Sequence, residues 1–484
     1  MKEVTLTVDG KKITVPAGTL LIDACEQNGI YIPRFCYHKH LFPSGNCRMC
    51  LVTIEKNPKP QPSCMTPVAD GMVVHTNTPE VAEIRKAVLE FILINHPLDC
   101  PICDKAGECM LQDQYMEFSG DKSRFNETKV AKEKLYHFGE KIVYDAERCI
   151  LCSRCVRITR EVSKTNKLGI LERGDRSYVA LAHGDTLDDD PYAYCVTDNC
   201  PVGALTPTYF RFKERVWYLH KTPSVCAGCS RGCNIWIETK DNVIYRVRPR
   251  ENDAVNKSWM CDFGREYYIY PPKNRAAGVK INHRAVDYGK FVSEVASLLK
   301  EHTKETAFVL SAYATNEELT LAKQLTEHLG IKGIFHKKDR VWQESTGEIR
   351  EDDILIKEDK TPNMAGVKNA FPDAKDINDM VISDFKYAVV WGPGAPLDKV
   401  SGLELIVISA MVDQVWDKAK YNLAGRISAE KHGSFTNFEG ITQDFRRAIK
   451  GENNYDELTF FVDLLKELGV KPIGRTVQEI QNAK

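Results

Sequence analysis

The chain has 484 residues, and this length predicts several domains. Its hydrophobic content of 43% suffices for several packed cores, and its formal net charge of −1 gives no electrostatic basis for binding nucleic acid. Because no stretch is apolar enough to span a membrane and the N-terminus lacks the apolar segment of a secretory signal, we expect no membrane insertion and a reducing compartment.

The first predicted elements are those of a small β-grasp domain. Residues 3–8 and 12–15 alternate apolar and polar side chains around an Asp-Gly turn, which predicts a β-hairpin. A short helix should follow over residues 20–28, with Thr19 as its cap and Gly29 in the left-handed conformation at its end. The chain then enters a cysteine-bearing loop, as expected for a domain that holds a metal centre.

The later elements change in kind along the chain. A helix predicted over residues 79–95 should deliver His96 to the segment that follows it. From about residue 288, helices and strands alternate, which predicts α/β layers. The polar residues 336–380 lack periodicity and are interpreted as a long insert, a partner-facing loop or a plain solvated loop. The elements predicted around this insert are strands at 234–239, 243–249, 307–311, 387–392 and 403–409, and helices at 288–302 and 315–329.

Cysteine is the most informative residue type in this sequence. All 17 cysteines lie between Cys25 and Cys261, so the C-terminal part has none. In a reducing compartment, such density favours metal ligation over disulfides. Only Cys25 and Cys195 fall outside the four groups described below, and both are predicted to be buried thiols without a ligand role.

The first group lies in the predicted β-grasp region with the spacing C-x10-C-x2-C-x13-C. Four thiolates of this kind can hold a [2Fe-2S] cluster, although the spacing differs from that of plant-type ferredoxins. The same donors also suit a structural zinc ion, and this alternative stays open. The members of the first group are Cys36, Cys47, Cys50 and Cys64.

The second group combines one histidine with three cysteines in HPLDCPICDKAGEC. This donor set is ordinary for zinc, and the isolated motif favours neither zinc nor an iron–sulfur cluster. If iron binds, a neutral imidazole in place of a thiolate should raise the reduction potential of the cluster. The members of the second group are His96, Cys100, Cys103 and Cys109.

The third group has the spacing C-x2-C-x2-C with a remote Cys-Pro. This is the signature of a bacterial [4Fe-4S] ferredoxin, in which three thiolates on one tight turn bind three irons and a remote thiolate binds the fourth. The second cluster of the two-cluster ferredoxins is missing, because Thr159-Arg160 replaces its Cys-Pro. The members of the third group are Cys149, Cys152, Cys155 and Cys200.

The fourth group has the spacing C-x2-C-x3-C-x27-C. Its count and density suit another [4Fe-4S] cluster, and a zinc ribbon is the alternative. The members of the fourth group are Cys226, Cys229, Cys233 and Cys261.

Several long motifs together resemble one known family. HPLDCPICDKAGEC, RCILCSRCVRITREV, NCPVGAL, SVCAGCSRGC and WMCDFGR are similar, in order and spacing, to the large iron–sulfur subunit of the bacterial NADH:quinone oxidoreductase, or complex I. The resemblance covers residues 1 to about 270. It implies one [2Fe-2S] cluster on the first group, a His-ligated [4Fe-4S] cluster on the second and ordinary [4Fe-4S] clusters on the third and fourth, the last being off the main electron path.

The resemblance also implies an architecture and a setting. The expected fold is multidomain, α+β and α/β. The segment AEKHGSFTNFEGITQDFRRAI resembles the end of the family's molybdopterin-oxidoreductase-like domain, which implies a shortened, noncatalytic domain of this kind in the C-terminal part. The implied partners are a flavoprotein that oxidises NADH, a small [2Fe-2S] subunit, and connecting iron–sulfur and quinone-site subunits on the cytoplasmic face of the inner membrane. The expected domains are residues 1–78, 79–118, 119–218, 219–275 and 276–484.

The expected role is that of an electron relay without catalytic residues. Gly392-Pro393-Gly394 lacks the third glycine and the helix start of a nucleotide loop, so we interpret it as a turn and place NADH and flavin chemistry on a partner. Basic residues beside the ligands, Arg48, Arg148, Arg154 and Arg231, are candidates for stabilising reduced clusters or are ordinary surface charges. The alternatives are a relay subunit of a soluble NAD-linked hydrogenase or formate dehydrogenase, and more remotely a zinc-stabilised scaffold.

Overall fold

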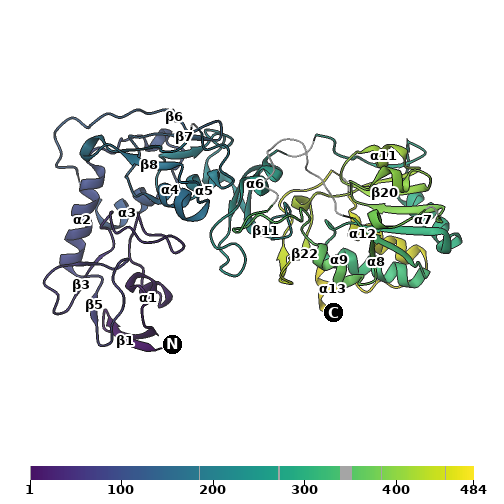
Figure 1. Ribbon diagram of the computed structural model, residues 1–484, viewed down its shortest axis with the longest axis horizontal. Helices are drawn as coiled ribbons and strands as arrows, with labels where there is room; N and C mark the ends of the chain where they lie inside the picture. Colours follow the sequence, from purple (N-terminus) through teal and green to yellow (C-terminus); the bar gives the residue numbers. More distant parts are fainter. Residues whose placement is uncertain are drawn as a thin grey trace. The chain divides into compact units, whose positions relative to one another are not determined.

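A computed structural model of the chain shows two compact units, Met1–Leu219 and His220–Lys484 (Figure 1). The described part of the chain comprises residues 2–120, 122–184, 186–270, 273–337, 351–382, 384–452 and 454–483. Within these ranges, no helix is long and apolar enough to cross a membrane. The two units are described separately below.

The first unit begins with a five-stranded sheet. Strands β1 (Glu3–Val8) and β2 (Lys11–Pro16) form the predicted antiparallel hairpin, and helix α1 (Leu21–Gln27) follows. The strand order is β2-β1-β5-β3-β4, with β1 and β5 parallel. Alternate apolar residues of the hairpin face a core that also contains the buried residues of α1, because successive side chains of a strand point to opposite faces. The remaining strands are β3 (Leu51–Ile54), β4 (Gln61–Pro62) and β5 (Val73–His75).

The ends of α1 test two predictions. Gly29 has φ +77°, so it takes the predicted left-handed conformation after the helix. The prediction that Thr19 caps the helix is wrong: the cap position is Leu20, which makes no side-chain cap, and the Thr19 hydroxyl donates to the Pro16 carbonyl at 2.8 Å. This local bond ties the hydroxyl to the preceding turn.

The rest of the first unit is built from short elements joined by ligand loops. Helix α2 (Pro79–Leu93) confirms the predicted helix, and Thr78 caps it by accepting from the Val81 amide at 3.2 Å. The other elements are α3 (Met110–Phe118), β6 (Tyr136–His137), β7 (Ile142–Tyr144), α4 (Arg154–Arg157), the π-helix Ile158–Val162, β8 (Leu168–Leu171), β9 (Tyr178–Leu181), α5 (Ala193–Asp198) and β10 (Leu205–Pro207), with the 3₁₀ turns Cys100–Ile102, Gly174–Arg176 and Val216–Tyr218.

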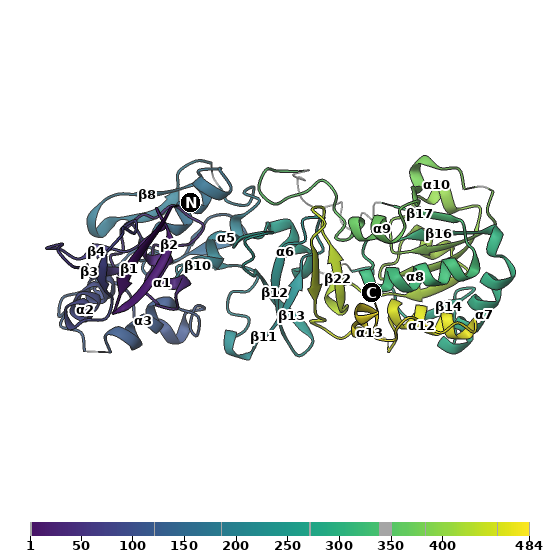
Figure 2. The same ribbon diagram turned by 90° about the horizontal axis from the view of Figure 1, so that it is seen from below.

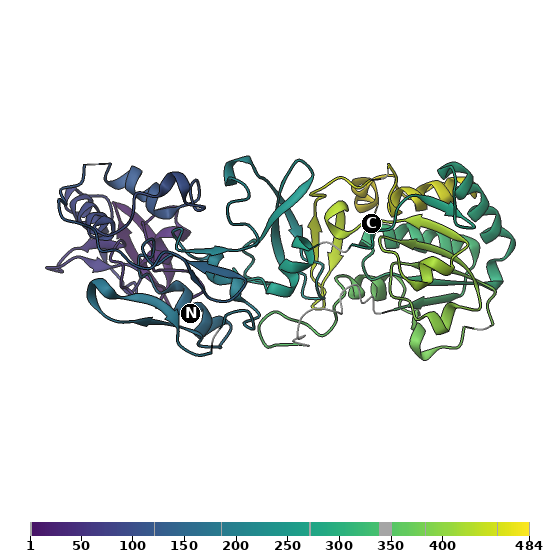
Figure 3. The ribbon, with the colours of Figure 1, turned by 90° about the horizontal axis from the view of Figure 1, so that it is seen from above.

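The second unit starts with an antiparallel three-stranded sheet in the order β11-β12-β13. A second hairpin, β22-β23, lies beside it although it comes almost 200 residues later in the sequence, as Figures 2 and 3 show. The Arg446 amide, next to β23, donates to the Pro223 carbonyl of β11 at 3.2 Å. The strands are β11 (His220–Val225), β12 (Asn234–Lys240), β13 (Val243–Pro249), β22 (Gly433–Thr436) and β23 (Thr442–Phe445), and helix α6 (Asp262–Ile269) follows β13.

The centre of the second unit is an eight-stranded sheet in the order β15-β14-β21-β20-β19-β16-β17-β18. Strands β16 to β21 run parallel to one another, and β14 pairs antiparallel with β21 and β15. From β16 the chain first adds β17 and β18 on one side and then returns to add β19 on the other. The strands are β14 (Val279–Ile281), β15 (Arg284–Ala285), β16 (Thr306–Leu310), β17 (Gly333–His336), β18 (Lys375–Asp376), β19 (Tyr387–Trp391), β20 (Glu404–Ser409) and β21 (Tyr421–Ala424).

Helices cover both faces of this sheet. Phe308 and Leu310 belong to the core shared with α7, α8 and α12, whereas Ala307 and Val309 belong to the core on the face of α11. Figure 1 shows α11 and α8 on opposite sides of the sheet. The layers therefore confirm the predicted α/β alternation. The helices are α7 (Tyr288–Glu301), α8 (Asn316–Leu329), α9 (Met364–Ala370), α10 (Leu397–Val400), α11 (Gln414–Lys418), α12 (Glu457–Glu467) and α13 (Val477–Asn482), with 3₁₀ turns at Thr303–Glu305, Ile377–Asp379 and Ser428–Glu430.

The prediction of an insert over residues 336–380 needs correction. Part of this range, residues 338–350, lies outside the described residues. The later part is folded into the domain: α9 packs Met364 and Val367 into the core beside α8, and β18 extends the sheet. Only a few apolar residues of this stretch reach the core, so the sequence shows no periodicity over its length.

Candidate metal centres

The first group of cysteines converges around two loops of the N-terminal sheet domain. The Cys36 amide donates to the Cys47 sulfur at 3.4 Å, and Arg48 takes φ +62° in the tight turn between Cys47 and Cys50. Hydrogen bonds with the Cys47 and Cys64 thiols lower the pKa of Cys36 well below its usual range, and a further bond joins Cys50 to Cys64. The structure therefore brings the four predicted sulfurs of this group together.

The second group follows helix α2, which delivers His96 as predicted. Burial lowers the pKa of His96 to about 4, helped by the charges of Lys129 and Arg148, so the imidazole is neutral at pH 7. Neutral imidazole is the form that binds a metal. The Nδ1 atom of His96 is buried and has no hydrogen-bond partner within the described part of the chain.

The three cysteines of the second group are close to one another. Cys100 begins a 3₁₀ turn, Cys103 follows that turn, and Cys109 is the cap residue of α3. Burial raises the pKa of Cys103 and raises that of Cys109 to about 11, with each thiol sensing the preceding one. Arg148 acts on the pKa of both His96 and Cys103, so its positive charge lies near the histidine and near this thiol.

The third group lines one small cavity. Its four cysteines all face this cavity: two come from the tight loop before α4, one from α4 itself and one from the loop after α5. The tight loop contains two non-glycine residues with left-handed backbone, Leu151 (φ +52°) and Ser153 (φ +60°), which turn successive sulfurs towards one centre. Burial raises the pKa of Cys149 to about 11 and that of Cys152 to about 12. The four members are Cys149, Cys152, Cys155 and Cys200.

The fourth group belongs to the second unit. Cys226 follows β11, Cys229 and Cys233 lie in the loop before β12, and Cys261 is the cap residue of α6, with the Gly264 amide donating to its sulfur at 3.4 Å. A Cβ atom on Gly264 would lie 2.8 Å from the Cys226 sulfur, so this position tolerates only glycine. Burial raises the pKa of all four thiols, as expected for donors that become anionic only when a metal binds.

The two remaining cysteines have the predicted environments. Cys25 lies in the core of the N-terminal domain, where burial raises its pKa to about 12, and Cys195 is fully buried in α5. All 17 cysteines are described and all are free thiols. Both thiols are thus buried, as the sequence predicts.

The first and third sites contact each other through residues next to their ligands. The Asn46 side chain, beside Cys47, donates to the carbonyl of Leu151 in the third ligand loop at 2.8 Å. In the same region, the Phe42 amide donates to the carboxylate of Glu161 at 2.8 Å. The first and third ligand loops therefore pack directly on each other.

The second and third sites are also in contact. The Met110 amide, next to Cys109, donates to the carbonyl of Pro201, next to Cys200, at 3.0 Å. A Cβ atom on Gly203 would lie 2.1 Å from the Cys103 sulfur, so glycine is required at this close approach. The third site therefore contacts both the first and the second in this unit.

The basic residues named from the sequence have different surroundings. Arg48 is exposed, whereas Arg148 is buried and bonds to Asp99 at 3.0 Å. Arg231 pairs with Glu439 at 3.2 Å. Arg154 and Arg157 are both buried among the ligand loops. Arg157 was not predicted from the sequence, although it lies one helical turn after Arg154 and therefore on the same side of α4.

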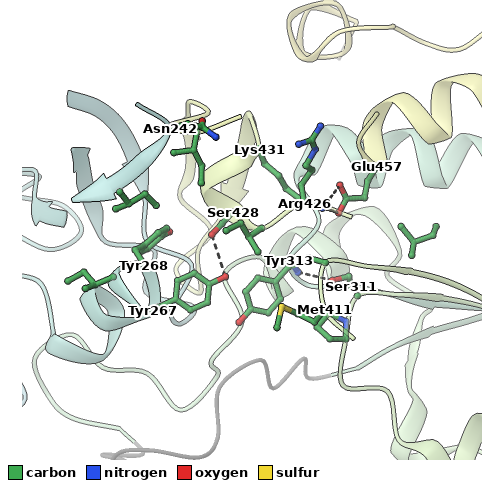
Figure 4. Close-up of a pocket in the computed structure, with 18 of the residues that line it drawn as sticks. Asn242, Tyr267, Tyr268, Ser311, Tyr313, Met411, Arg426, Ser428, Lys431 and Glu457 are labelled. Atoms are coloured by element: carbon green, nitrogen blue, oxygen red, sulfur yellow. Dashed lines mark hydrogen bonds and ion pairs between the residues drawn. The ribbon is translucent and has the colours of Figure 1, made fainter. Parts of the chain in front are cut away.

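The second unit also contains a cavity of about 380 Å³ (Figure 4). It lies at the carboxyl ends of β16 and β19, between which the order of the strands reverses, and Ser311, Gly392 and Pro393 line it there. Such crevices are the usual ligand sites of open α/β sheets. Figure 4 shows Tyr267 and Tyr313 on one side and the Lys431–Glu457 ion pair, 3.0 Å long, on the other.

Comparison with known proteins assigns cluster-binding families to all four groups. The matching family models are the 2Fe-2S iron-sulfur cluster binding domain at residues 1–79, the NADH-ubiquinone oxidoreductase-G iron-sulfur binding region at 85–124, the NADH-quinone oxidoreductase subunit 3 ferredoxin-like domain at 139–206, and the molybdopterin oxidoreductase Fe4S4 domain at 219–270.

Two curated relatives match over most of this chain. The chain is 46% identical over 345 residues to the mitochondrial NADH-ubiquinone oxidoreductase 78 kDa subunit of Neurospora crassa, covering 69% of this chain and 46% of the relative. It is 43% identical over 265 residues to a subunit of the NADH-quinone oxidoreductase of Rickettsia bellii, covering 55% of this chain and 39% of the relative. The match thus spans less than half of either relative's length.

A solved structure, an NAD⁺-reducing [NiFe]-hydrogenase in the H₂-reduced state, matches with a TM-score of 0.40 and 29% identity, over 44% of this chain and 91% of that chain. The family models and the four donor groups define the class: the chain is an iron–sulfur protein with 2Fe-2S and 4Fe-4S binding domains. Within that class, these relatives are subunits of NADH-ubiquinone and NADH-quinone oxidoreductases, and two of the matching family models describe iron–sulfur regions of the same enzymes, which confirms the resemblance found in the sequence.

Proposed function

We propose that this chain relays single electrons from a flavoprotein that oxidises NADH towards quinone. The observation that carries this function is the contact between cluster sites: the third site touches the first through Asn46 and the second through Met110. A zinc scaffold does not require its metal sites to share ligand loops in this way. A relay does, because electrons must pass from one site to the next.

The donor sets fit the clusters implied by the family. We assign a [2Fe-2S] cluster to the first group and [4Fe-4S] clusters to the other three, with His96 as the one nitrogen ligand. The thiols of each group face one another, and the buried Nδ1 of His96 lacks a protein partner among the described residues. When bound, these clusters supply reversible one-electron redox chemistry. The protein residues exclude water, hold the ligands and set the charge around each site.

The expected domain plan fits the same function. We propose ligand domains at residues 1–78, 79–118, 119–218 and 219–275, the first a β-grasp domain, and a shortened molybdopterin-oxidoreductase-like domain at 276–484. The C-terminal domain has no cysteine, and the cavity of about 380 Å³ that it shares with residues of the domain at 219–275 is near the lower limit for one small ligand. We therefore propose that this domain is a noncatalytic scaffold.

The proposed setting is a peripheral position in a membrane complex, on the cytoplasmic face. The partners are the NADH-oxidising flavoprotein, a small [2Fe-2S] subunit, and the connecting iron–sulfur and quinone-site subunits. The relative from Rickettsia bellii is named as a subunit of an NADH-quinone oxidoreductase, which supports a complex of this kind. The family models that match residues 85–124 and 139–206 favour this setting over a soluble hydrogenase or formate dehydrogenase complex.

Metal analysis tests the proposal directly. The protein purified without oxygen should contain about 14 iron atoms per chain, with matching labile sulfide and little zinc. A variant with all four cysteines of the fourth group replaced by serine should lose about 4 iron atoms. Stoichiometric zinc with little sulfide in the wild-type protein would reject the relay function.

A further inference from the structure

The guanidinium of Arg157 connects a ligand of the first site to a ligand of the third. Its Nη2 atom donates to the Cys36 carbonyl and, at 3.3 Å, to the Cys152 carbonyl. Its Nη1 atom donates to the carbonyl of Phe42 at 2.6 Å, and its Nε to the Ser153 hydroxyl at 3.3 Å. One side chain, 3% exposed, thus joins the backbone of two ligand loops that lie more than 100 residues apart in sequence.

Arg154, one turn earlier, reaches the neighbours of ligands from three sites. Its Nη2 donates to the Tyr37 carbonyl at 2.5 Å, next to Cys36. Its Nη1 donates to the carbonyl of Asn199, next to Cys200, at 3.4 Å and lies 3.8 Å from the sulfur of Met110, next to Cys109. Arg154 therefore lies where the first, second and third ligand loops meet.

Arg154 and Arg157 each place a positive charge in the protein interior, where a charge without an opposite charge nearby is rare. Every hydrogen bond recorded for them within the described residues goes to a carbonyl, a hydroxyl or a thioether, and none goes to a carboxylate. A buried cation needs a compensating negative charge. Clusters held by four thiolates carry net negative charge, and reduction makes it larger. The two sites that Arg157 joins would supply that charge.

We propose that Arg154 and Arg157 are positioning residues that form a shared cationic clamp between the first and third cluster sites. The clamp holds both ligand loops in place and offsets the negative charge of both clusters. Reduction of either site, by one electron from the reductant, is stabilised by the same pair of charges. This inference rests on the proposed function, because it requires clusters at both sites.

The clamp predicts that one substitution changes the properties of two clusters. In the full chain, Arg157→Gln removes the charge, so the midpoint potentials of the first-site and third-site clusters should both fall in redox-poised EPR. Arg157→Lys keeps the charge but not the planar fork that bonds two carbonyls, so its potentials should lie between those of Arg157→Gln and the wild type. A residue with only a structural role would not produce this graded, charge-dependent shift.

The matched control is Arg160→Gln, since Arg160 is three residues further along, its side chain is 57% exposed and it pairs with Glu161. This variant should leave both potentials unchanged, and the fourth site, in the other unit, is the internal reference. A shift of only one potential in Arg157→Gln, or of neither, would overturn the clamp.

Loss of iron in Arg157→Gln is also decisive. The clamp requires that the first and third sites lose their clusters together while the fourth keeps its own, and loss confined to one of the two sites would overturn it. Absence of labile sulfide from the wild-type protein would instead reject the proposed function. The two failures are therefore distinguishable.

Discussion

At the scale of single residues, protonation states prepare the donors of each site. Burial keeps His96 neutral, whereas it raises the pKa of most ligand thiols above that of a free cysteine. A metal that binds must displace the protons of these thiols, whereas the neutral imidazole binds without losing a proton. His96 is therefore the one proposed ligand that adds no negative charge to its cluster.

Replacing His96 with cysteine tests its role as a ligand. His96→Cys restores a fourth thiolate, so the cluster should persist with a midpoint potential lower by an amount of order 100 mV, because a more negative cluster is harder to reduce. Redox-poised EPR measures the change, and iron analysis confirms retention. His96→Ala, the control, should weaken cluster binding. An intact cluster with an unchanged potential in His96→Cys would exclude His96 as a ligand.

The metal ligands could be predicted from the sequence more completely than the residues that surround them. Cysteine spacing carries the chemistry of ligation, so all sixteen predicted ligands could be named before the structure, and their groups converge as expected. The bonds of Arg157 to Cys36 and Cys152 depend on the packing of two domains, which no spacing encodes. Similarly, the need for glycine at position 203 follows from a sulfur 100 residues earlier in the chain.

At the scale of elements, the positions of helices and strands were predicted well where apolar residues recur regularly, and poorly where they do not. The hairpin, α2, α7 and α8 have the expected positions because apolar residues recur at the period of each structure. The start of α1 was predicted wrongly because the Thr19 hydroxyl bonds to the Pro16 carbonyl and does not cap the helix. The folded residues 364–377 were missed because the short helix α9 contributes few apolar residues.

The residue that follows β17 is a buried lysine whose ionisation should affect stability. Lys337 is 1% exposed, its ammonium donates to the Pro393 carbonyl at 2.8 Å, and burial lowers its pKa to about 7. Between pH 7 and about 10.5, the unfolded chain holds a proton on Lys337 that the folded chain has lost. The stability of the wild type should therefore rise with pH across this window through this group.

Lys337→Met removes the contribution of this group. The variant should be more stable than the wild type near pH 7, by at most about 5 kcal/mol, and its advantage should shrink as the pH approaches 10. Denaturant unfolding of both proteins over this pH range measures the difference. The control Lys332→Met changes an exposed lysine just before β17, and its difference from the wild type should not depend on pH. A pH-independent difference for Lys337→Met would contradict the prediction.

At the scale of the whole molecule, the fourth cysteine group folds with the C-terminal part. The Ser230 amide donates to the Asp359 carbonyl at 2.8 Å, and the Phe438 amide donates to the Ser230 carbonyl at 3.0 Å. Gln443 of β23 bonds to the Gly232 carbonyl at 2.8 Å. The loop that carries Cys229 and Cys233 is therefore supported by residues more than 100 positions later.

A truncated chain that ends at Leu219 tests this division. It keeps every contact among the first three sites, so it should retain about 10 iron atoms and the EPR signals of those sites. A chain that ends at residue 275 lacks the support of β22 and β23, so its fourth cluster should be lost more readily than in the full protein. Iron content and EPR of the two truncations, compared with the full chain, measure both effects. Loss of the first three clusters on truncation at Leu219 would contradict the two-unit description.

The burial of the ligand thiols also has a consequence for the biogenesis of the protein. Once the first unit has folded, the sulfurs of the third site carry protons, because burial raises the pKa to about 11 for Cys149 and to about 12 for Cys152. A cluster that binds this site must displace those protons, because only thiolates ligate iron. Cluster loading at the third site therefore releases protons, and the yield of loaded protein should fall when the medium is made more acidic.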